Sequence, residues 1–293
     1  MVRKMKVLIV GLDGLDYNLV KRWNIKTYQQ KCCGRHYVGF AKTLYTPILW
    51  SCFLVGRNIT HEYNLERLRR KRAIDGLNPL LRPFYKIRLK FFSKKIGIRN
   101  ILVKLKLANP YPPSIMPDHL KRQTFLEKAR QQGKTVIAIE VPGYNETKNE
   151  FYRSRCKDYI FRPLREKLEF LKIVSRDSES RIKEAYEKVE KFTDLVFLYV
   201  PMPDLAHHLL FRSLKERIEL YKIYNDLGRM IEPLLKKAYR NNYVVLIISD
   251  HGFDIKKYYH SSYGFWSLNK DLNWRPKTIL NFHSKILELI ETP

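Results

Sequence analysis

Four short apolar runs, separated by amphipathic segments, constrain the fold of this chain more than any other feature. Each run is rich in Val, Ile and Leu and has the length of a buried strand; the runs are 6–14, 135–143, 194–201 and 243–249. Between them, apolar residues recur at helical spacing in 180–192 and 213–239, and the second segment could be broken near Gly228 or Pro233. Alternating strands and helices predict an α/β fold with a largely parallel central sheet flanked by helices.

Acidic residues and a histidine stand where two of these runs end. Asp13 lies at the end of the first run, and Asp250 and His251 directly follow the last one in "YVVLIISDH". Sites in open parallel sheets form beyond the carboxyl ends of the strands, so we expect these side chains to share one edge. Taken alone, Asp13 could equally be an ordinary turn residue, and Asp16 offers a second carboxyl nearby.

A third run is followed by a segment with the spacing of metal ligands, "PDLAHH". If this segment is helical, Asp204 and His208 lie on one face and can chelate one ion, so the spacing favours His208 over His207. His260 lies farther along the chain, after a loop whose sequence does not predict where the His260 side chain lies relative to the other ligands. Three aspartates and three histidines in all would suit two divalent ions, with zinc expected and manganese or iron as alternatives.

The segment "YTPILWSCFLVG" supplies a candidate nucleophile. Pro47 suits the first turn of a helix, so Thr46 is expected at the N-cap, and Gly56 can close the helix. A hydroxyl at that end lies beside backbone N–H groups that favour an anion. A metal ion would lower the pKa of the hydroxyl and activate it near neutral pH.

The order of these motifs resembles the alkaline phosphatase superfamily, and most of all its branch of type I phosphodiesterases and nucleotide pyrophosphatases. The resemblance rests on "GLDG" after the first strand, "TPILW" with "LVG" as a nucleophile helix, "PDLAHH", "SDHG", and a later histidine before an aromatic-rich segment. The related sulfatases carry Cys or Ser in a C-x-P-x-R motif, whereas Cys52 is followed by "FLVG". Phosphoglycerate mutases of the superfamily are longer and use a serine.

The resemblance implies an alkaline-phosphatase-like sheet and two divalent ions about 4 Å apart. Thr46 would attack phosphorus and form a phosphothreonine, which water then hydrolyses. The implied ligands are Asp13, Asp250, His251 and the Thr46 oxygen for one ion, and Asp204, His208 and His260 for the other. Asn64 would contact a phosphate oxygen of the substrate, although "GRNITHEYN" is shorter than the corresponding segment of the family.

The charge of the chain is strongly positive and unevenly placed. Lys and Arg number 56 against 29 Asp and Glu, a net charge of +27. Basic residues are densest in 65–106, interleaved with Leu, Ile and Phe, so we divide the chain into a catalytic core at 1–60 and 125–293 and a basic cap or insertion at 61–124. The insertion could be a solvated surface, a lid for phosphorylated small molecules or lipid head groups, or a surface for an anionic membrane; nucleic acid fits it less well.

The cysteines and the N-terminal segment indicate a reduced, cytoplasmic protein, with the periphery of a membrane as the alternative location. Cys32, Cys33, Cys52 and Cys156 show no CxxC spacing. The apolar run near the N-terminus is shorter than the roughly 7 to 15 residues of a signal peptide core, and no stretch approaches the roughly 18 apolar residues of a membrane span.

These observations predict a metal-dependent hydrolase of phosphate esters, with diesters preferred to monoesters. Two alternatives stay open: a phosphomonoesterase of the same superfamily, and a non-catalytic protein that binds an anionic membrane or nucleic acid. The presence of every expected ligand favours the enzyme.

Overall fold

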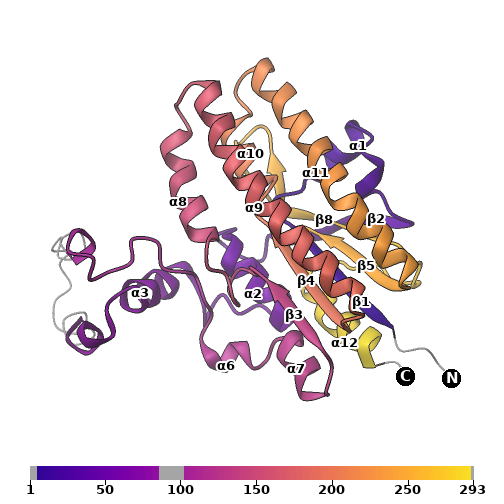
Figure 1. Cartoon of the computed structure of the whole chain (residues 1–293), viewed down its shortest axis with the longest axis horizontal. Helices are drawn as coiled ribbons and strands as arrows, with labels where there is room; N and C mark the ends of the chain where they lie inside the picture. The colour runs from indigo at the N-terminus through magenta and orange to yellow at the C-terminus, as the bar shows by residue number, and fades with distance from the viewer. Residues whose placement is uncertain (1–4, 86–101, 292–293) are drawn as a thin grey trace.

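A six-stranded sheet with helices on both faces forms the centre of the computed structural model, which describes residues 5–85 and 102–291 (Figure 1). The strands follow the order β2–β8–β5–β1–β4–β3. Their bounds are Lys6–Leu12 (β1), Cys32–Tyr37 (β2), Val136–Ile139 (β3), Leu195–Val200 (β4), Tyr243–Ile248 (β5) and Tyr263–Leu268 (β8). The predicted α/β fold with a largely parallel sheet is confirmed.

The four predicted strands are the parallel ones, and β1 lies between β4 and β5. Leu12 of β1 pairs with Val200 of β4, and Gly11 pairs with Ile248 of β5. Because the three strands end level with one another, the residues that follow them meet at one edge of the sheet. This register is what brings together segments that are far apart in sequence.

The strands β2 and β8 were not predicted. β8 runs antiparallel to both β2 and β5 and extends the sheet beyond its parallel part. β2 has the sequence "CCGRHY", which contains Gly, Arg and His, and only Cys32 and His36 in it are buried. A strand of this kind has no continuous apolar run, so hydrophobicity alone does not reveal it.

Helices cover both faces, which explains why the central strands are apolar throughout. In β1, Leu8 and Val10 belong to one core cluster, whereas Val7 and Ile9 belong to the other. The first cluster contains residues of α1 (Tyr17–Arg22), α8 (Asn149–Tyr159), α9 (Leu164–Glu190), α10 (Asp204–Leu209) and α11 (Leu214–Arg240). The second contains residues of α2 (Thr46–Val55), α3 (Leu65–Asp75), α6 (Asp118–Lys121), α7 (Phe125–Gln131) and α12 (Phe282–Glu291).

Helix α11 corrects one expectation, because it continues unbroken through Gly228 and Pro233. A capping box at Ser213 and Glu216 begins it, and nine of its residues are buried along one stripe. Packing against the sheet and α9 evidently outweighs the local cost of the proline, which lacks an N–H to donate within the helix. Helix α9 is also longer than the predicted segment 180–192.

The described part of the basic segment stands apart from the sheet. Helix α3 and the chain after it project away from the body of the molecule (Figure 1), and no described residue of 61–124 belongs to the six-stranded sheet. Residues 86–101, the middle of the basic stretch, lie outside the described residues. The division into core and insertion therefore stays a prediction. Across the described ranges, we find no helix with both the length and the apolarity that crossing a bilayer requires.

Candidate metal centre

The first group of potential ligands lies where β1 and β5 end. Asp13, Asp250 and His251 offer ligand atoms that all lie within 4.8 Å of one another, and the three side chains are buried. His251 Nε2 is 3.5 Å from Asp13 Oδ1 and 3.5 Å from Asp250 Oδ2. The parallel register of the two strands thus joins residues separated by more than 200 positions.

The second group combines helix α10 with a segment near the C-terminus. Asp204, His208 and His260 also offer ligand atoms within 4.8 Å of one another. Asp204 Oδ2 is 3.4 Å from His208 Nε2, and its other oxygen, Oδ1, is 3.4 Å from His260 Nε2. Asp204 and His208 lie four residues apart in a helix, as their spacing predicts.

The two groups adjoin each other and form one centre. The Asp204 backbone N–H donates to the Asp13 carbonyl oxygen at 2.8 Å, and the rings of His251 and His260 stack with centroids 3.7 Å apart. The structure therefore brings together all six Asp and His side chains that were predicted as ligands. Their role as ligands stays a prediction.

A small hairpin places His260, whose reach the sequence left open. Strands β6 (Gly252–Asp254) and β7 (Tyr259–Ser261) pair so that Phe253 lies opposite His260. The Nδ1 atom of His260 lies 2.7 Å from the carbonyl oxygen of Leu44, which can only accept. Nδ1 must therefore carry a proton, which leaves Nε2 as the ring atom that faces Asp204 and that would bind an ion.

His251 is held in the same tautomer. Its Nδ1 lies 3.0 Å from the Gly252 carbonyl oxygen, so Nδ1 donates and Nε2 keeps a lone pair. Burial lowers the pKa of His251 to about 4, which keeps the ring neutral at physiological pH. Neutral imidazole is the form that binds a metal ion.

The carboxylates of the first group repel one another in a buried space. Burial, together with the charges of Asp250 and Asp204, raises the pKa of Asp13 well above its ordinary value. Burial also raises the pKa of Asp250 to about 7. Burial acts in the same direction at Asp204, but His208 and His260 outweigh it and hold the pKa of this carboxyl well below its ordinary value.

Unpaired buried atoms show that these residues fit divalent cations. Asp204 Oδ1, Asp250 Oδ2 and His251 Nε2 are inaccessible to water and have no hydrogen-bond partner. Leaving such atoms unsatisfied is costly, and a cation bound in each group would satisfy all three while offsetting the repulsion between the acids. Mixed imidazole nitrogen and carboxylate oxygen ligands suit zinc and also manganese or iron.

The candidate nucleophile lies against the first group. Thr46 Oγ1 is 3.4 Å from Asp13 Oδ1, and Thr46 is buried. One detail differs from the expectation: Tyr45 is the N-cap of α2, and Thr46 is the first helical residue. The hydroxyl still lies in the first turn, where backbone N–H groups lack helical acceptors. Gly56 ends the helix at a φ of 77°, as predicted.

Two other polar residues near the centre, His207 and Asp16, form hydrogen bonds that stabilise the fold. The ring of His207 is buried, and its Nε2 lies 2.8 Å from the Tyr224 hydroxyl. Asp16 caps α1 by accepting from the Leu19 N–H at 2.9 Å. Neither His207 nor Asp16 belongs to the two groups of potential ligands.

Asn64 caps helix α3, and its Oδ1 accepts from the Arg67 N–H at 2.9 Å. It also lines a hollow of about 420 Å³ together with Lys42, Thr43 and His61. Its predicted contact with a substrate phosphate stays a prediction.

Two further contacts at the centre were not predicted. The Tyr199 hydroxyl donates to Asp13 Oδ2 at 2.5 Å, and the Gly14 N–H donates to Asp250 Oδ1 at 3.4 Å. Tyr199 is in the buried strand β4, opposite Gly11 of β1. In sequence it is indistinguishable from a core aromatic residue, so only the pairing of β1 with β4 reveals its role.

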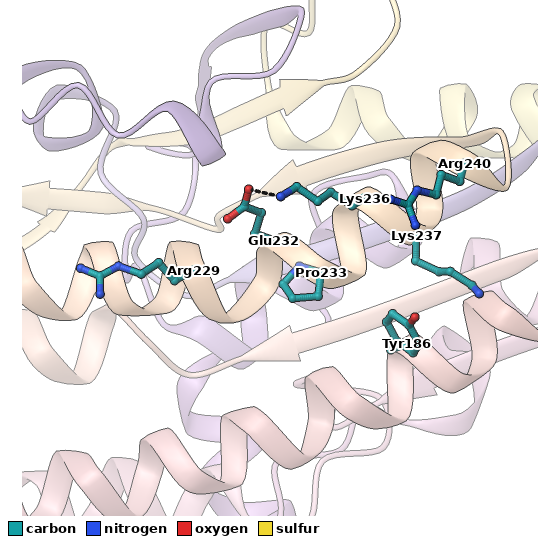
Figure 2. A pocket seen from close by; sticks show the side chains of 7 residues that line it. All are labelled: Tyr186, Arg229, Glu232, Pro233, Lys236, Lys237 and Arg240. Carbon is teal, nitrogen blue, oxygen red and sulfur yellow. Dashed lines mark ion pairs between the residues drawn. The ribbon is translucent and has the colours of Figure 1, made fainter.

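A separate hollow of about 270 Å³ lies between α9 and α11 (Figure 2). Its lining residues are Tyr186, Arg229, Glu232, Pro233, Lys236, Lys237 and Arg240. Helix α11 ends at Arg240, shortly before β5 begins at Tyr243. This hollow therefore lies toward the end of the sheet where the parallel strands begin, opposite the metal centre.

Comparison with known proteins gives one family match and several similar folds. The family model described as type I phosphodiesterase / nucleotide pyrophosphatase matches residues 98–264, more than half of the chain. This segment contains Asp204, His208, Asp250, His251 and His260 and leaves out Asp13 and Thr46. The search of curated proteins gave no match.

Among solved structures, a 2-O GAG sulfatase is similar with a TM-score of 0.55 and 9% identity, over 99% of this chain and 71% of that one. A protein from Pyrococcus horikoshii is similar with a TM-score of 0.51 and 13% identity, over 100% of this chain and 99% of that one. At these identities, the likeness concerns the fold alone.

Proposed function

The chain belongs to the type I phosphodiesterase / nucleotide pyrophosphatase family and is a hydrolase of phosphoric esters, and we propose that Thr46 is its nucleophile at a centre for two divalent ions. One observation carries the proposal. Six potential ligands from separate segments converge in two groups of three, and the hydroxyl of Thr46 lies beside one of these groups. The two groups are the same two ligand sets that the family resemblance implies.

Thr46, Asp13 and Tyr199 have different roles in the proposed reaction. Thr46 Oγ1 attacks phosphorus, the bond from phosphorus to the leaving oxygen breaks, and the hydroxyl proton passes toward Asp13 Oδ1, which already faces it at 3.4 Å. Tyr199 holds the other oxygen of Asp13 and so orients the carboxylate. When bound, the divalent ions lower the pKa of the attacking hydroxyl and neutralise charge on the phosphoryl oxygens. Water then hydrolyses the phosphothreonine and restores Thr46.

The hollow lined by Asn64 supports a phosphorylated small molecule as the substrate. Its wall includes Thr43, the neighbour of Leu44, whose carbonyl oxygen binds His260. Lys42, His61 and Glu66 line the same hollow, and within the described residues Lys42 forms no ion pair. A lysine that is not held in an ion pair attracts anions, so we expect the part of the substrate beyond the scissile bond to carry negative charge. A phosphodiester with an anionic leaving group fits this arrangement.

Hydrolysis of bis-p-nitrophenyl phosphate and p-nitrophenyl phosphate tests the proposal. Metal-stripped protein should be inactive, and Zn²⁺ or Mn²⁺ should restore turnover, with the diester preferred. Thr46→Ala should lower kcat on the order of 10³-fold or more, whereas Thr46→Ser should keep part of the activity because a hydroxyl remains.

Ser51→Ala is the matched control for Thr46→Ala. Ser51 lies on the same helix, and its hydroxyl donates to the Pro47 carbonyl oxygen at 2.6 Å, away from the potential ligands. Its replacement should leave turnover nearly unchanged. Full activity of Thr46→Ala would place the nucleophile elsewhere, and the absence of turnover with every metal would favour a non-catalytic binding protein.

A further inference from the structure

We propose that the described part of the basic insertion is a docking surface for a bilayer that contains anionic lipid. The surface consists of the exposed apolar residues Leu80, Phe84 and Leu105, which we call the apolar tip, and the exposed basic residues Arg69, Arg70, Lys104 and Lys106, which we call the basic rim. This inference concerns where the protein binds. It does not depend on the chemistry proposed for Thr46.

The apolar tip exposes large side chains that a folded protein normally covers. Leu80 is 81% exposed, Phe84 72% and Leu105 61%. Backbone pairing holds the two stretches of chain that carry them together, because the Asn78 N–H donates to the Leu107 carbonyl oxygen at 2.9 Å. Exposed apolar side chains on one projecting part of the chain favour transfer out of water.

The basic rim has no counter-charges of its own. None of Arg69, Arg70, Lys104 and Lys106 has an acidic partner among the described residues. In the wider segment 61–124, sixteen Lys and Arg face only four Asp and Glu. Uncompensated basic residues beside exposed apolar ones match an anionic lipid surface, whose head groups take the charges while its acyl region takes the apolar tip.

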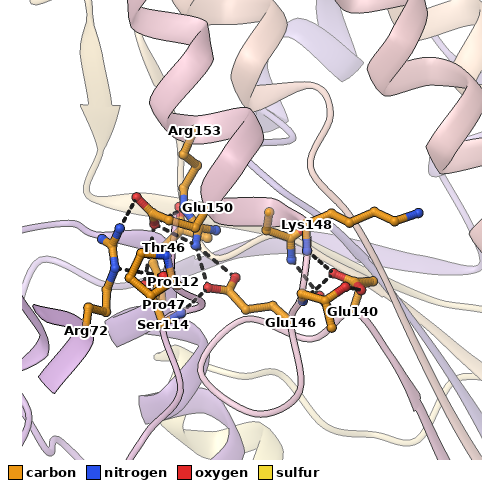
Figure 3. Close-up of polar contacts among 12 residues, drawn as sticks. Thr46, Pro47, Arg72, Pro112, Ser114, Glu140, Glu146, Lys148, Glu150 and Arg153 are labelled. Atoms are coloured by element: carbon orange, nitrogen blue, oxygen red, sulfur yellow. Dashed lines mark hydrogen bonds and ion pairs between the residues drawn. The ribbon is translucent and has the colours of Figure 1, made fainter. Parts of the chain in front are cut away.

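A buried ionic network fixes the insertion to the core beside the metal centre (Figure 3). Arg72 of α3 pairs with Glu150 of α8 at 2.6 Å, and its Nε donates to the Pro112 carbonyl oxygen at 3.0 Å. Glu150 also pairs with Arg153 at 3.2 Å and accepts from the Tyr45 hydroxyl at 3.3 Å. Tyr45 immediately precedes the candidate nucleophile. A bilayer bound to the insertion would therefore be held in a defined orientation to the metal centre.

The combination of features favours a membrane over nucleic acid. Binding to a phosphate backbone depends on basic side chains and gains nothing from exposed Leu and Phe that do not contact bases. The apolar tip would be left in water in such a complex. On a bilayer, both parts of the surface are used at once.

Co-sedimentation with vesicles tests the proposal on the full-length protein. We expect binding to phosphatidylcholine vesicles that contain phosphatidylglycerol, weakening as salt is raised, and little binding to phosphatidylcholine alone. Near an anionic surface each Lys or Arg contributes roughly fivefold in affinity, so the combined variant R69Q, R70Q, K104Q and K106Q should bind more weakly by on the order of several hundredfold. The combined variant L80S, F84S and L105S should also bind more weakly, by tenfold or more.

Matched controls separate this surface from net charge and general hydrophobicity. The variant R229Q, K236Q, K237Q and R240Q removes four basic residues from the hollow of Figure 2 and should bind vesicles nearly as the wild type does. Phe161→Ser removes an 85% exposed aromatic outside the insertion and should likewise have little effect. All variants should keep the thermal midpoint of the wild type, which excludes misfolding as the cause.

Three results would overturn the proposal. The first is equal binding to neutral and anionic vesicles, and the second is wild-type binding by both insertion variants. The third is that the protein binds a single- or double-stranded oligonucleotide more tightly than it binds vesicles at the same phosphate concentration, and that both insertion variants lose this oligonucleotide binding. That third result would assign the surface to nucleic acid instead.

Discussion

At the scale of single residues, the two histidines of "PDLAHH" show how neighbouring side chains acquire different tasks. His208 is 29% exposed and faces Asp204, whereas His207 is buried against Tyr224 and Phe253. Burial lowers the pKa of His207 to about 3, so its ring stays neutral and acts as a packed hydrogen-bonding group. The helical rotation between adjacent residues separates a potential ligand from a core residue.

This difference predicts opposite effects for two matched substitutions. His207→Ala should lower the free energy of unfolding of the metal-free protein by about 2–4 kcal/mol, because it leaves a cavity and an unpaired Tyr224 hydroxyl. His208→Ala should change that stability by less than about 1 kcal/mol but should weaken metal-dependent turnover. Chemical denaturation and p-nitrophenyl ester hydrolysis measure the two effects. The reverse pattern would assign the ligand role to His207.

Glu150 predicts a pH dependence of stability. Burial alone would raise the pKa of Glu150, but Arg153 and Arg72 outweigh it and lower the pKa below the ordinary value. A lowered folded-state pKa means that the stabilisation is present above the unfolded value of about 4.3 and is lost as pH falls below it. With a chelator present, the thermal midpoint of Glu150→Gln should therefore lie below that of the wild type at pH 7, and this gap should shrink below about pH 4. A gap that does not depend on pH would contradict the ionic role of Glu150.

At the scale of elements, helix α2, which carries the candidate nucleophile Thr46, is held at both ends. Its first turn packs beside the metal centre, and its last turn ends at Gly56, which adopts a left-handed backbone against α12. A Cβ on Gly56 would lie 2.5 Å from the Cβ of His283, whereas a Cβ on Gly133, with a similar φ of 74°, would meet nothing within 4 Å. A side chain at Gly133 would therefore cause backbone strain alone, whereas a side chain at Gly56 would cause both backbone strain and a steric clash.

The comparison of these glycines gives a direct prediction. Gly133→Ala should cost about 1 kcal/mol of stability, from the left-handed backbone alone. Gly56→Ala should cost about 2–4 kcal/mol, because α2 or α12 must also shift. Denaturant unfolding of both variants measures the difference. Equal losses of unfolding free energy in the two variants would show that α2 and His283 can move apart without strain.

At the scale of the whole molecule, the metal centre joins segments from both halves of the chain. Asp13 and Thr46 come from the first 50 residues, and the other potential ligands come from residues beyond 200. An ion bound between them would cross-link β1, α10, β5 and the hairpin of β6 and β7. Metal binding should therefore stabilise the complete fold.

Thermal unfolding with and without metal measures this coupling. Zn²⁺ at about one hundred times its dissociation constant should add about 2.7 kcal/mol per site, which corresponds to a rise of several degrees in the thermal midpoint. Asp250→Asn and Asp204→Asn should each reduce the rise. Asp16→Asn, which changes a helix cap outside the two ligand groups, should lower the midpoint but keep the rise. A metal-induced rise that survives both ligand substitutions would place the ion elsewhere.

Much of the core was predictable because its signal is local. The four apolar runs correspond to β1, β3, β4 and β5, because strands covered on both faces need unbroken apolar sequence. Five of the six potential ligands were found because each follows a strand or stands at helical spacing, whereas His260 was found from its place in the order of the family's motifs. Strand β2 escaped prediction because an edge strand can carry Gly, Arg and His.

By itself, the sequence determined which strands are buried, which side chains could bind metal, and that basic residues concentrate in one segment. These properties depend on composition and spacing over a few residues. Only the tertiary structure decided that Tyr199 contacts Asp13, that the hairpin brings His260 to Asp204, and that Arg72 fastens the insertion beside Tyr45. Each of these contacts joins residues far apart in the chain, and they form only when packing of the whole sheet and its helices sets the register between the segments.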